Sequence, residues 1–371
     1  MIEIGPKAFI HLDRIKSNFE KIQKRIGDRE ILSVVKANGY GHGAVEIAKT
    51  ISHFKNSNFA VFSFDEAIQL RKADINNDII IFSKMQPEFI DQAFKNNIIL
   101  NLSSIEDIKI LKDYKSETNN CPRYHIKFDT GMTRLGIDIK DSDQLYKKII
   151  KDLVIHPEGI YTHFATADEG DLLYAHLQLE KFKRVVDMAE KYNIKLKYVH
   201  CSNSGALLNL QESYFNMIRV GMLLYGALPS NEVPNDIDIK PVMSFCGSIV
   251  NLRRVPAGTN VSYGAIYTTK NKTNIGVIQT GFADGFPRQW YELGFVHYNG
   301  KEYKIAGRVC MDQLMVDFGD TVPKIGDDVL FFGKNSNGHI PIETIADSIK
   351  STPYVLLTAI GGRTKHIYIR N

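Results

Sequence analysis

Cysteine is scarce in this sequence, and the cysteines present do not form a metal-binding pattern. Only four occur in 371 residues (Cys121, Cys201, Cys246 and Cys310), far apart and without a CxxC pair. This spacing excludes a zinc module and a scaffold held together by disulfides. We therefore expect reduced cysteines in the core of a cytoplasmic protein, and no bound metal.

Long apolar runs and a strong charge of one sign are also missing. No stretch approaches the length of a membrane span, and residues 1–19 contain no apolar segment followed by a small-residue cleavage site. The 46 basic and 42 acidic residues are spread along the chain and leave a net charge of +4. Without a basic run or an aromatic–basic stripe, we expect neither a nucleic acid nor a membrane as a partner.

Short β-branched runs alternate with longer amphipathic segments through the first two-thirds of the chain. The length of 371 residues exceeds that of a usual single domain, and 44% hydrophobic with 24% charged residues is ordinary for a globular protein. Runs this short and apolar are typical of parallel strands buried on both faces. There are eight: Ile31–Val35, Phe59–Phe62, Ile79–Phe82, Ile98–Leu100, Tyr124–Phe128, Gly159–Thr162, Leu196–Val199 and Met217–Val220.

Helical segments separate these runs. One begins after Ser103 or Ser104, either of which is a suitable N-cap, and another is predicted over Leu177–Tyr192. Strands that alternate with helices can close as a barrel or stay open as a doubly wound sheet. The number of strands favours the barrel, and the turn at residues 36–43 does not fit the GxGxxG pattern of the open sheet. We predict a TIM-type (β/α)8 barrel with its active site at the carboxyl ends of the strands.

The character of the sequence changes after Gly226. Residues 229–235 are rich in turn formers and predict a linker. Strand-like segments separated by glycine and proline follow, with little helical pattern: Met243–Arg253, Asn274–Thr280, Tyr303–Ala306, Leu314–Phe318 and Val329–Phe332. We therefore predict an α/β protein with two domains, the barrel over residues 1–235 and a mostly β C-terminal domain over residues 236–371.

Lys36 directly follows the first predicted strand and should point into the mouth of the barrel. A lysine in this position is usually a surface residue whose apolar stem packs on the protein. Here, however, Gly39, Gly41 and Gly43 follow it and allow the backbone to turn tightly and approach a ligand closely. This combination favours a functional role for Lys36.

Other polar residues end strands on the same side of the barrel. His163, His200 and Arg219 are expected to converge on Lys36. Barrels often bind phosphate after their seventh and eighth strands, which here means Ser204 and Gly221. A lysine beside a phosphate cradle indicates a phosphorylated aldehyde held as a Schiff base.

The segment VVKANGYGHG, which contains Lys36, resembles the lysine signature of bacterial alanine racemases, the fold-type III pyridoxal-phosphate enzymes. The resemblance covers essentially the whole chain and continues around Tyr354 and, in order, at KFDTGMTRLG, YTHFATAD, HCSNSGA, IRVGMLLYG, VSYGAIY, GFADGFPR and GRVCMDQLMVD. It implies an isomerase that uses pyridoxal 5'-phosphate to interconvert L-alanine and D-alanine and so supplies D-alanine for peptidoglycan.

The resemblance also implies a role for each matching residue. Lys36 binds the cofactor covalently and is the base that works on D-alanine. Tyr263 is the base on the opposite face and works on L-alanine. In the family this tyrosine comes from the partner subunit, so a homodimer with two shared active sites is implied.

Further contacts with cofactor and substrate follow from the same resemblance. Arg219 hydrogen-bonds the pyridine nitrogen, His200 braces Arg219, and His163 lies against the ring. Phosphate contacts are implied for Tyr40, Ser204, Gly221 and Tyr354, and cofactor contacts also for Asn203 and Met222. Arg134 and the backbone of Met311 contact the substrate carboxylate, and Asp312 supports the Met311 loop. Lys127 matches a lysine that is carbamylated in some members, where it positions the arginine equivalent to Arg134.

Chemical reasoning agrees with these roles. Removing a proton from one face of a carbon and returning it to the other needs two bases, and one lysine cannot reach both faces. A tyrosine, with an unperturbed pKa of about 10, needs cationic neighbours such as Arg134 to act as a base. Arg219 can only donate hydrogen bonds, so it keeps the pyridine nitrogen unprotonated and the ring a weak electron sink.

Two positions depart from the family pattern, and two other functions stay open. Phe282 stands where a tyrosine is common, and Pro353 precedes Tyr354, where it restricts its neighbours. One alternative function is a serine or broader-specificity amino-acid racemase, because an added hydroxyl is hard to exclude from a small pocket. The other is a pyridoxal-phosphate-binding protein without catalysis, although such relatives lack a β domain.

Overall fold

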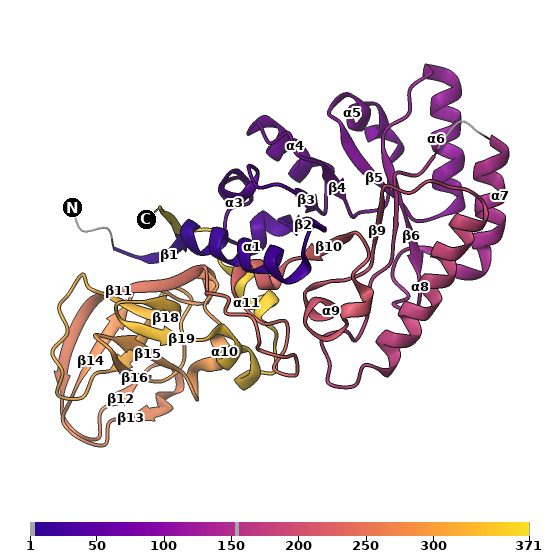
Figure 1. The fold of residues 1–371 in the computed structure, drawn as a ribbon. Helices are drawn as coiled ribbons and strands as arrows, with labels where there is room; N and C mark the ends of the chain where they lie inside the picture. The colour runs from indigo at the N-terminus through magenta and orange to yellow at the C-terminus, as the bar shows by residue number, and fades with distance from the viewer. Residues whose placement is uncertain (1–3, 153–155, 371) are drawn as a thin grey trace.

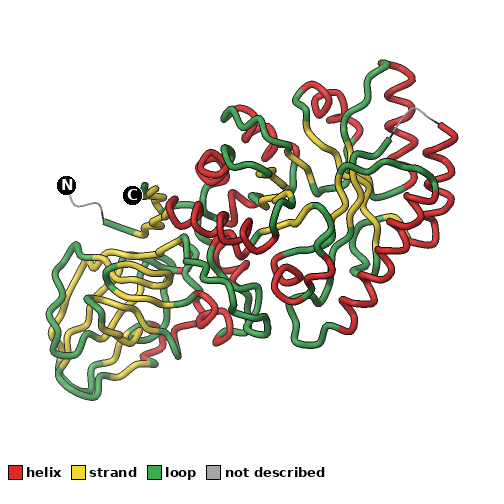
Figure 2. The backbone as a smooth tube through the Cα atoms, in the orientation of Figure 1, coloured by secondary structure: helices red, strands yellow, loops and turns green. Residues whose placement is uncertain are grey.

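The chain forms two lobes, one of alternating strands and helices and the other mainly of strands (Figures 1 and 2). The computed structural model describes residues 4–152 and 156–370. Residues 1–3 and 371, at the outer ends of the two predicted domains, therefore lie outside the described part. Residues 1–3 also belong to the opening segment 1–19, in which the sequence analysis expects no signal peptide. The predicted fold class, a (β/α)8 barrel followed by a mostly β region, is confirmed.

Eight parallel strands form the sheet of the first lobe, and each predicted run contributes one of them. The seventh is displaced: the sequence predicts Leu196–Val199, whereas the strand covers Tyr198–His200. Most residues in these strands are buried, as expected for strands covered on both faces. In spatial order they are β10 (Met217–Val220), β2 (Glu30–Val34), β3 (Ser57–Val61), β4 (Ile79–Ile81), β5 (Ile98–Leu102), β6 (Tyr124–Asp129), β8 (Gly159–Tyr161) and β9 (Tyr198–His200).

Helices pack around this sheet, and two of them begin at serine caps. Ser63 and Ser104 each accept a hydrogen bond from the backbone three residues later, and Glu66 and Asp107 return the bond as capping boxes. The barrel helices are α1 (Leu12–Ile26), α3 (Ala44–Ile51), α4 (Phe64–Lys72), α5 (Ile90–Lys95), α6 (Ile105–Thr118), α7 (Ser142–Asp152), α8 (Leu173–Lys191) and α9 (Ser204–Asn209), with the short strand β7 (Ile137–Asp138) beside β6.

The two edge strands of the eight-stranded sheet, β9 and β10, approach each other. The backbone N–H of Arg219 in β10 donates to the carbonyl of Ser202, just beyond β9, at 3.0 Å. This contact leaves the barrel nearly closed, so the carboxyl ends of all eight strands surround one space.

The second lobe is a sheet in which six strands form a closed ring. The pairing β11–β14–β17–β16–β15–β18 returns to β11, because β18 also pairs with β11. These six strands are β11 (Met243–Val255), β14 (Thr273–Ile278), β15 (Phe295–Tyr298), β16 (Lys301–Ile305), β17 (Leu314–Asp317) and β18 (Asp328–Asn335). The smaller elements are β12 (Asn260–Val261), β13 (Tyr267–Thr268), β19 (Gly338–Ile340), α10 (Ile342–Ser348) and α11 (Pro353–Ala359).

Both ends of the described chain lie at the same edge of the second sheet (Figure 1). Strand β1 (Pro6–His11) pairs antiparallel with β11 and parallel with β20 (Lys365–Ile369). The N-terminal strand therefore contributes to the second sheet before the chain enters the barrel. The division at residues 235 and 236 stays a prediction.

Helix α11 reaches back from the second lobe to the barrel. A side chain at Gly41, which has a φ of 79°, would collide with the carbonyl oxygen of Leu357, so only glycine allows this close approach. Pro353 occupies the first turn of α11, where its missing N–H is harmless.

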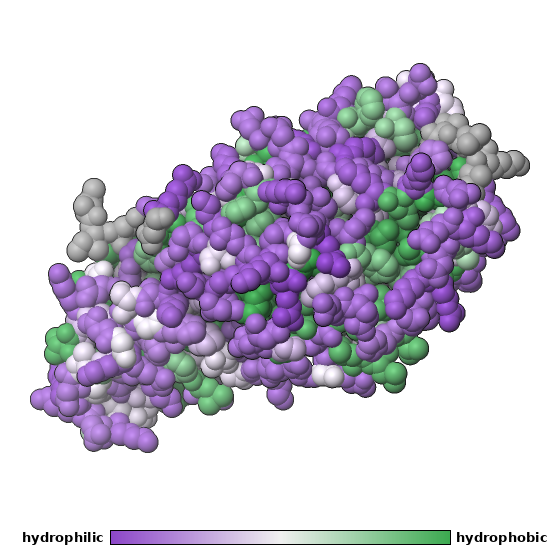
Figure 3. All heavy atoms as spheres, in the orientation of Figure 1, coloured by the Kyte–Doolittle hydropathy of each residue, from purple (hydrophilic) through white to green (hydrophobic). Residues whose placement is uncertain are grey.

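The surface seen in Figure 3 is mostly hydrophilic, with hydrophobic residues in separate patches. No helix of residues 4–152 and 156–370 is long and apolar enough to cross a membrane.

Candidate active site

A cavity of about 680 Å³ opens at the carboxyl ends of the barrel strands. It brings together most of the residues that the sequence predicts for the site, and α11 closes one side of it. The predicted residues that line it are Lys36, Tyr40, Lys127, Arg134, His163, Asn203, Ser204, Arg219, Gly221 and Tyr354.

The loop that begins at Lys36 has an unusual backbone. Ala37, Asn38, Gly39 and Tyr40 all have φ between 50° and 63°, although a side chain disfavours this left-handed region. Glu66 supports the loop, since Oε1 accepts from the N–H of Ala37 at 2.7 Å. Strain of this kind persists only where surrounding contacts hold it, and it is typical of functional sites.

Two lysines in the cavity have a pKa below the ordinary value for lysine. Burial and the positive charge of Arg134 lower the pKa of Lys36, while Glu66 raises it by a smaller amount. Burial, Arg134 and Arg219 lower the pKa of Lys127 to about 8. Both shifts favour the neutral amine, which is the form that acts as a nucleophile or a base.

Arg219 is buried at the base of the cavity and held by several acceptors. Nη1 donates to Nδ1 and to the carbonyl of His200 at 3.0 and 3.1 Å. Nη2 donates to the carbonyls of Thr162 and Cys201 at 2.8 and 2.9 Å and to Nδ1 of His163 at 3.0 Å. No acceptor in the described part of the chain receives the Nε–H, so one donor remains for a ligand.

Buried histidines surround this guanidinium. His200 lies behind Arg219, and its Nε2 faces Nδ1 of His125 at 3.0 Å. Burial, followed by the charge of Arg219, lowers the pKa of both His163 and His200, so both rings are neutral at neutral pH. Burial also lowers the pKa of Arg219 to about 10, which leaves it charged.

Hydroxyl groups gather at the other end of the cavity. The rings of Tyr40 and Tyr354 lie 5.8 Å apart, and neither hydroxyl bonds to an acceptor in the described residues. The N–H of Gly221 donates to Oγ of Ser204 at 3.2 Å. A Cβ at Gly221 would lie 2.8 Å from the hydroxyl of Tyr40, so glycine keeps this end of the cavity open.

These features fit pyridoxal 5'-phosphate. The free Nε–H of Arg219 suits a pyridine nitrogen, which is an acceptor, and the hydroxyls of Tyr40, Tyr354 and Ser204 suit a phosphate. The amine of Lys36 suits an aldehyde. No group of three or more His, Cys, Asp or Glu side chains in residues 4–152 and 156–370 is placed to hold a metal ion.

Several predicted residues lie outside this cavity. Met222 is fully buried, in the turn after β10. Tyr263 and Met311 are 68% and 56% exposed on the second lobe. Asp312 makes an ion pair with Arg363 at 2.8 Å. One copy of the chain therefore does not bring Tyr263, Met311 and Asp312 to Lys36.

The structure also identifies residues that the sequence analysis does not single out. The ring of Tyr161 lines the cavity, stacks on His200 with centroids 4.8 Å apart and lies 5.5 Å from the guanidinium carbon of Arg219. Glu66 supports the Lys36 loop. The segment YTHFATAD contains Tyr161, but nothing in the sequence distinguishes Glu66 from an ordinary residue in the first turn of a helix.

Comparison with known proteins identifies the family. Profiles described as "Alanine racemase, N-terminal domain" and "Alanine racemase, C-terminal domain" match residues 10–229 and 242–368. An alanine racemase of Carboxydothermus hydrogenoformans is 36% identical over 98% of this chain and 99% of its own.

Comparison with solved structures identifies the same family. An alanine racemase of Bacillus anthracis with bound L-Ala-P has a TM-score of 0.90 and 32% identity, covering 100% of this chain and 96% of the other. One of Bartonella henselae with covalently bound pyridoxal phosphate has a TM-score of 0.89 and 28% identity, covering 99% and 100%. The chain belongs to the alanine racemase family.

Proposed function

We propose that this protein is an alanine racemase that interconverts L-alanine and D-alanine with bound pyridoxal 5'-phosphate. The observation that carries the proposal is the cavity itself. It combines the amine of Lys36, the unused Nε–H of Arg219 and the hydroxyls of Tyr40 and Tyr354. The relatives with L-Ala-P and with covalently bound pyridoxal phosphate support the same substrate and cofactor.

Pyridoxal 5'-phosphate, when bonded to the amino group of the substrate in place of the amine of Lys36, would make the Cα–H acidic enough for a protein base to remove the proton. Arg219 would donate its Nε–H to the pyridine nitrogen and cannot transfer the proton. Tyr40, Ser204 and Tyr354 would donate to the phosphate, with the backbone at Gly221 beside it. The proposed set of cofactor residues also includes His163, His200, Asn203 and Met222.

Lys36 supplies one of the two bases that the reaction needs. Its lowered pKa favours the neutral amine, which can accept the Cα proton on its own face of the substrate. Arg134, at the mouth of the cavity, would bind the substrate carboxylate as a bidentate partner. Lys127, whose amine is repelled by the charge of Arg134, would help to position Arg134 once it is carbamylated.

The tyrosines of the same cavity are poor candidates for the second base. Burial raises the pKa of Tyr40, Tyr161 and Tyr354, which disfavours the phenolate that could accept a proton. Tyr161 also donates its hydroxyl proton to Asn101 at 2.9 Å. The second base must therefore come from outside this set.

We assign the second base to Tyr263 of a second copy of the chain. Its ring is 68% exposed, and it lies on the second lobe beside other exposed residues such as Ile266. A homodimer would place this face over the partner's cavity.

We also assign a substrate contact to the backbone of Met311, with Asp312 supporting its loop. The carbonyl of Met311 accepts a hydrogen bond from the N–H of Ala283 at 3.0 Å, which anchors this loop. The proposal includes the division into a barrel (1–235) and a C-terminal domain (236–371).

A role in supplying D-alanine for peptidoglycan, in the cytoplasm, is part of the same proposal. The cysteines support that location, because all four are free thiols and thiols stay reduced there.

Incubation of the purified protein with L-alanine, L-serine and other amino acids in turn, followed by chiral chromatography, tests the proposal. We expect D-alanine as the main product. Tyr263→Phe should keep the bound cofactor and lose most racemisation, whereas Tyr303→Phe, a control in the same lobe, should keep both. Faster turnover of serine would favour the broader-specificity racemase, and bound cofactor without any D-product would favour the non-catalytic alternative.

A further inference from the structure

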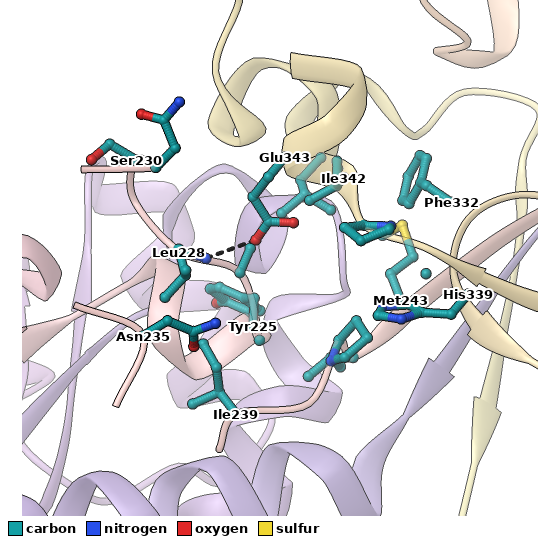
Figure 4. Close-up of a pocket in the computed structure, with 18 of the residues that line it drawn as sticks. Tyr225, Leu228, Ser230, Asn235, Ile239, Met243, Phe332, His339, Ile342 and Glu343 are labelled. Carbon is teal, nitrogen blue, oxygen red and sulfur yellow. Dashed lines mark hydrogen bonds between the residues drawn. The ribbon is translucent and has the colours of Figure 1, made fainter. Parts of the chain in front are cut away.

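A second cavity, of about 430 Å³, lies between the two lobes. Small-molecule sites typically measure about 300–1,000 Å³. None of the residues that line this cavity also lines the Lys36 cavity. One wall is the segment 225–243, which joins the lobes, and the other comes from the second lobe. Figure 4 shows side chains from both walls directed toward the same space.

The walls are mostly apolar and contain one carboxylate. Leu228 and Ile239 face the cavity from the joining segment, and Phe332 and Ile342 face it from the second lobe (Figure 4). Oε1 of Glu343 accepts from the N–H of Leu228 at 2.9 Å. This bond fixes the carboxylate at the boundary between the two lobes.

Within the described residues, the carboxylate of Glu343 forms no ion pair with a cation. No lysine or arginine lines the cavity, and no ion pair between described side chains includes Glu343. His339 also lines the cavity. Burial and the nearby Lys334 lower its pKa, and Glu343 raises it by less, so the ring is neutral at neutral pH. Glu343 is therefore the one charged side chain of a mostly apolar lining, and Arg14, which donates to the carbonyl of the lining residue Pro241 at 2.7 Å, lies behind the wall.

We propose that this cavity is a binding site for a small organic cation. The ligand's ammonium group would donate a charge-assisted hydrogen bond to the carboxylate of Glu343. Its apolar body would lie against Leu228, Ile239 and Phe332, where removal of apolar surface from water stabilises the complex. An anionic ligand is disfavoured because it would meet the same carboxylate.

The position of the cavity connects it to the racemase site. The ring of Tyr225 lines the cavity and packs against His42 and Tyr40 with centroids 4.5 and 5.0 Å apart. Leu357 also lines it, one turn of α11 beyond Tyr354. A bound cation therefore contacts residues that support the Lys36 loop and links the two lobes, so it should raise the thermal midpoint of unfolding.

N,N-dimethyl-2-phenylethylamine is a suitable probe. It is protonated at neutral pH, and as a tertiary amine it cannot form a Schiff base with an aldehyde in the Lys36 cavity. Calorimetric titration of the cofactor-loaded protein should show saturable binding of one probe per chain. Glu343→Gln keeps an acceptor for the Leu228 N–H but removes the charge, and it should weaken binding by about tenfold.

Two further variants keep the test selective. Asn235→Trp, at an exposed position that lines the cavity, should obstruct the site and abolish binding. Glu232→Gln, an exposed carboxylate of the same segment outside the lining, should bind the probe as the unaltered protein does. All three variants should racemise L-alanine normally without the probe, so the racemase assignment is tested separately. Absence of saturable binding, or equal affinity in Glu343→Gln, would overturn the proposal.

Discussion

His125 and His200 face each other in the barrel core, with Nδ1 of one 3.0 Å from Nε2 of the other. Arg219 determines which of the two rings donates the proton in the hydrogen bond between them. Because guanidinium only donates, Nδ1 of His200 must accept from it. His200 therefore has its proton on Nε2 and donates to Nδ1 of His125. One charged donor thus sets the tautomers of two histidines.

Replacing His125 with phenylalanine should disturb this relay. The Nε2–H of His200 would lose its acceptor, whereas Nε2 of His125 has no hydrogen-bond partner among the described residues. We expect a loss of about 1–3 kcal/mol in the free energy of unfolding, measured with urea, and a changed absorption spectrum of the bound cofactor because Arg219 is less firmly oriented. His11→Phe, a buried histidine of the second lobe, is the control and should leave the spectrum unchanged. An unaltered spectrum in His125→Phe would contradict the relay.

Glu66 should matter for cofactor binding although it does not line the cavity. Its Oε2 accepts from the N–H groups of Phe62 and Ser63 at 2.7 and 3.2 Å, while Oε1 holds Ala37. In Glu66→Gln the new amide would turn a donor toward one of these N–H groups. We expect affinity for pyridoxal phosphate to fall by about tenfold, consistent with the loss of a partly buried charged acceptor. Equilibrium dialysis measures this, and Asp65→Asn, the exposed neighbour, should match the unaltered protein.

Lys127 should react with carbon dioxide. Its pKa of about 8 leaves much of the amine neutral at slightly alkaline pH. The neutral amine adds to CO₂, forms a carbamate and releases a proton, and Arg134 and Arg219 favour the resulting anion. With ¹³C-bicarbonate, NMR should show a carbamate carbon that disappears in Lys127→Met and persists in Lys140→Met. A signal that survives loss of Lys127 would refute the assignment.

Stability should fall as the pH drops below about 6.5. Burial lowers the pKa of His11 and His42 to about 4 and that of His125 to about 3. Below 6.5 the unfolded chain binds protons that the folded chain does not, so each such histidine reduces stability by about 1.4 kcal/mol per pH unit down to its folded pKa. Urea unfolding between pH 7 and pH 4.5 measures the slope. A flat profile from pH 6.5 to pH 5 would show that these rings are protonated in the fold.

The barrel could be predicted from sequence because its signals are local. Each buried strand is a short apolar run, and Ser104 marks a helix start with its own cap. The strands of the second lobe are harder to predict from the sequence. The sequence pattern does not predict strand β15, although Asn299 and Gly300 form its turn to β16, because the polar His297 interrupts the apolar pattern. Strands β1 and β20 pair across the whole length of the chain, which no local pattern reveals.

The candidate site likewise contains residues that the sequence predicts and residues that it does not. Lys36, His163, His200 and Arg219 follow or end strands, and barrel geometry alone predicts that they converge. Glu66 could not be found, because its role depends on a contact with the N–H of Ala37, distant in sequence. Tyr263 lies outside the cavity of its own chain, and its proposed role across a dimer comes from the family resemblance, because no local pattern in the sequence indicates it.

The most direct test of the central claim, that Lys36 and Tyr263 act together across a dimer, uses two inactive variants. Lys36→Ala and Tyr263→Phe can be co-expressed with different affinity tags, and the doubly tagged heterodimer purified. One of its two sites then contains both native residues and the other contains neither. We predict racemisation of L-alanine at about half the rate of the unaltered dimer, and a heterodimer as inactive as its parents would contradict the account.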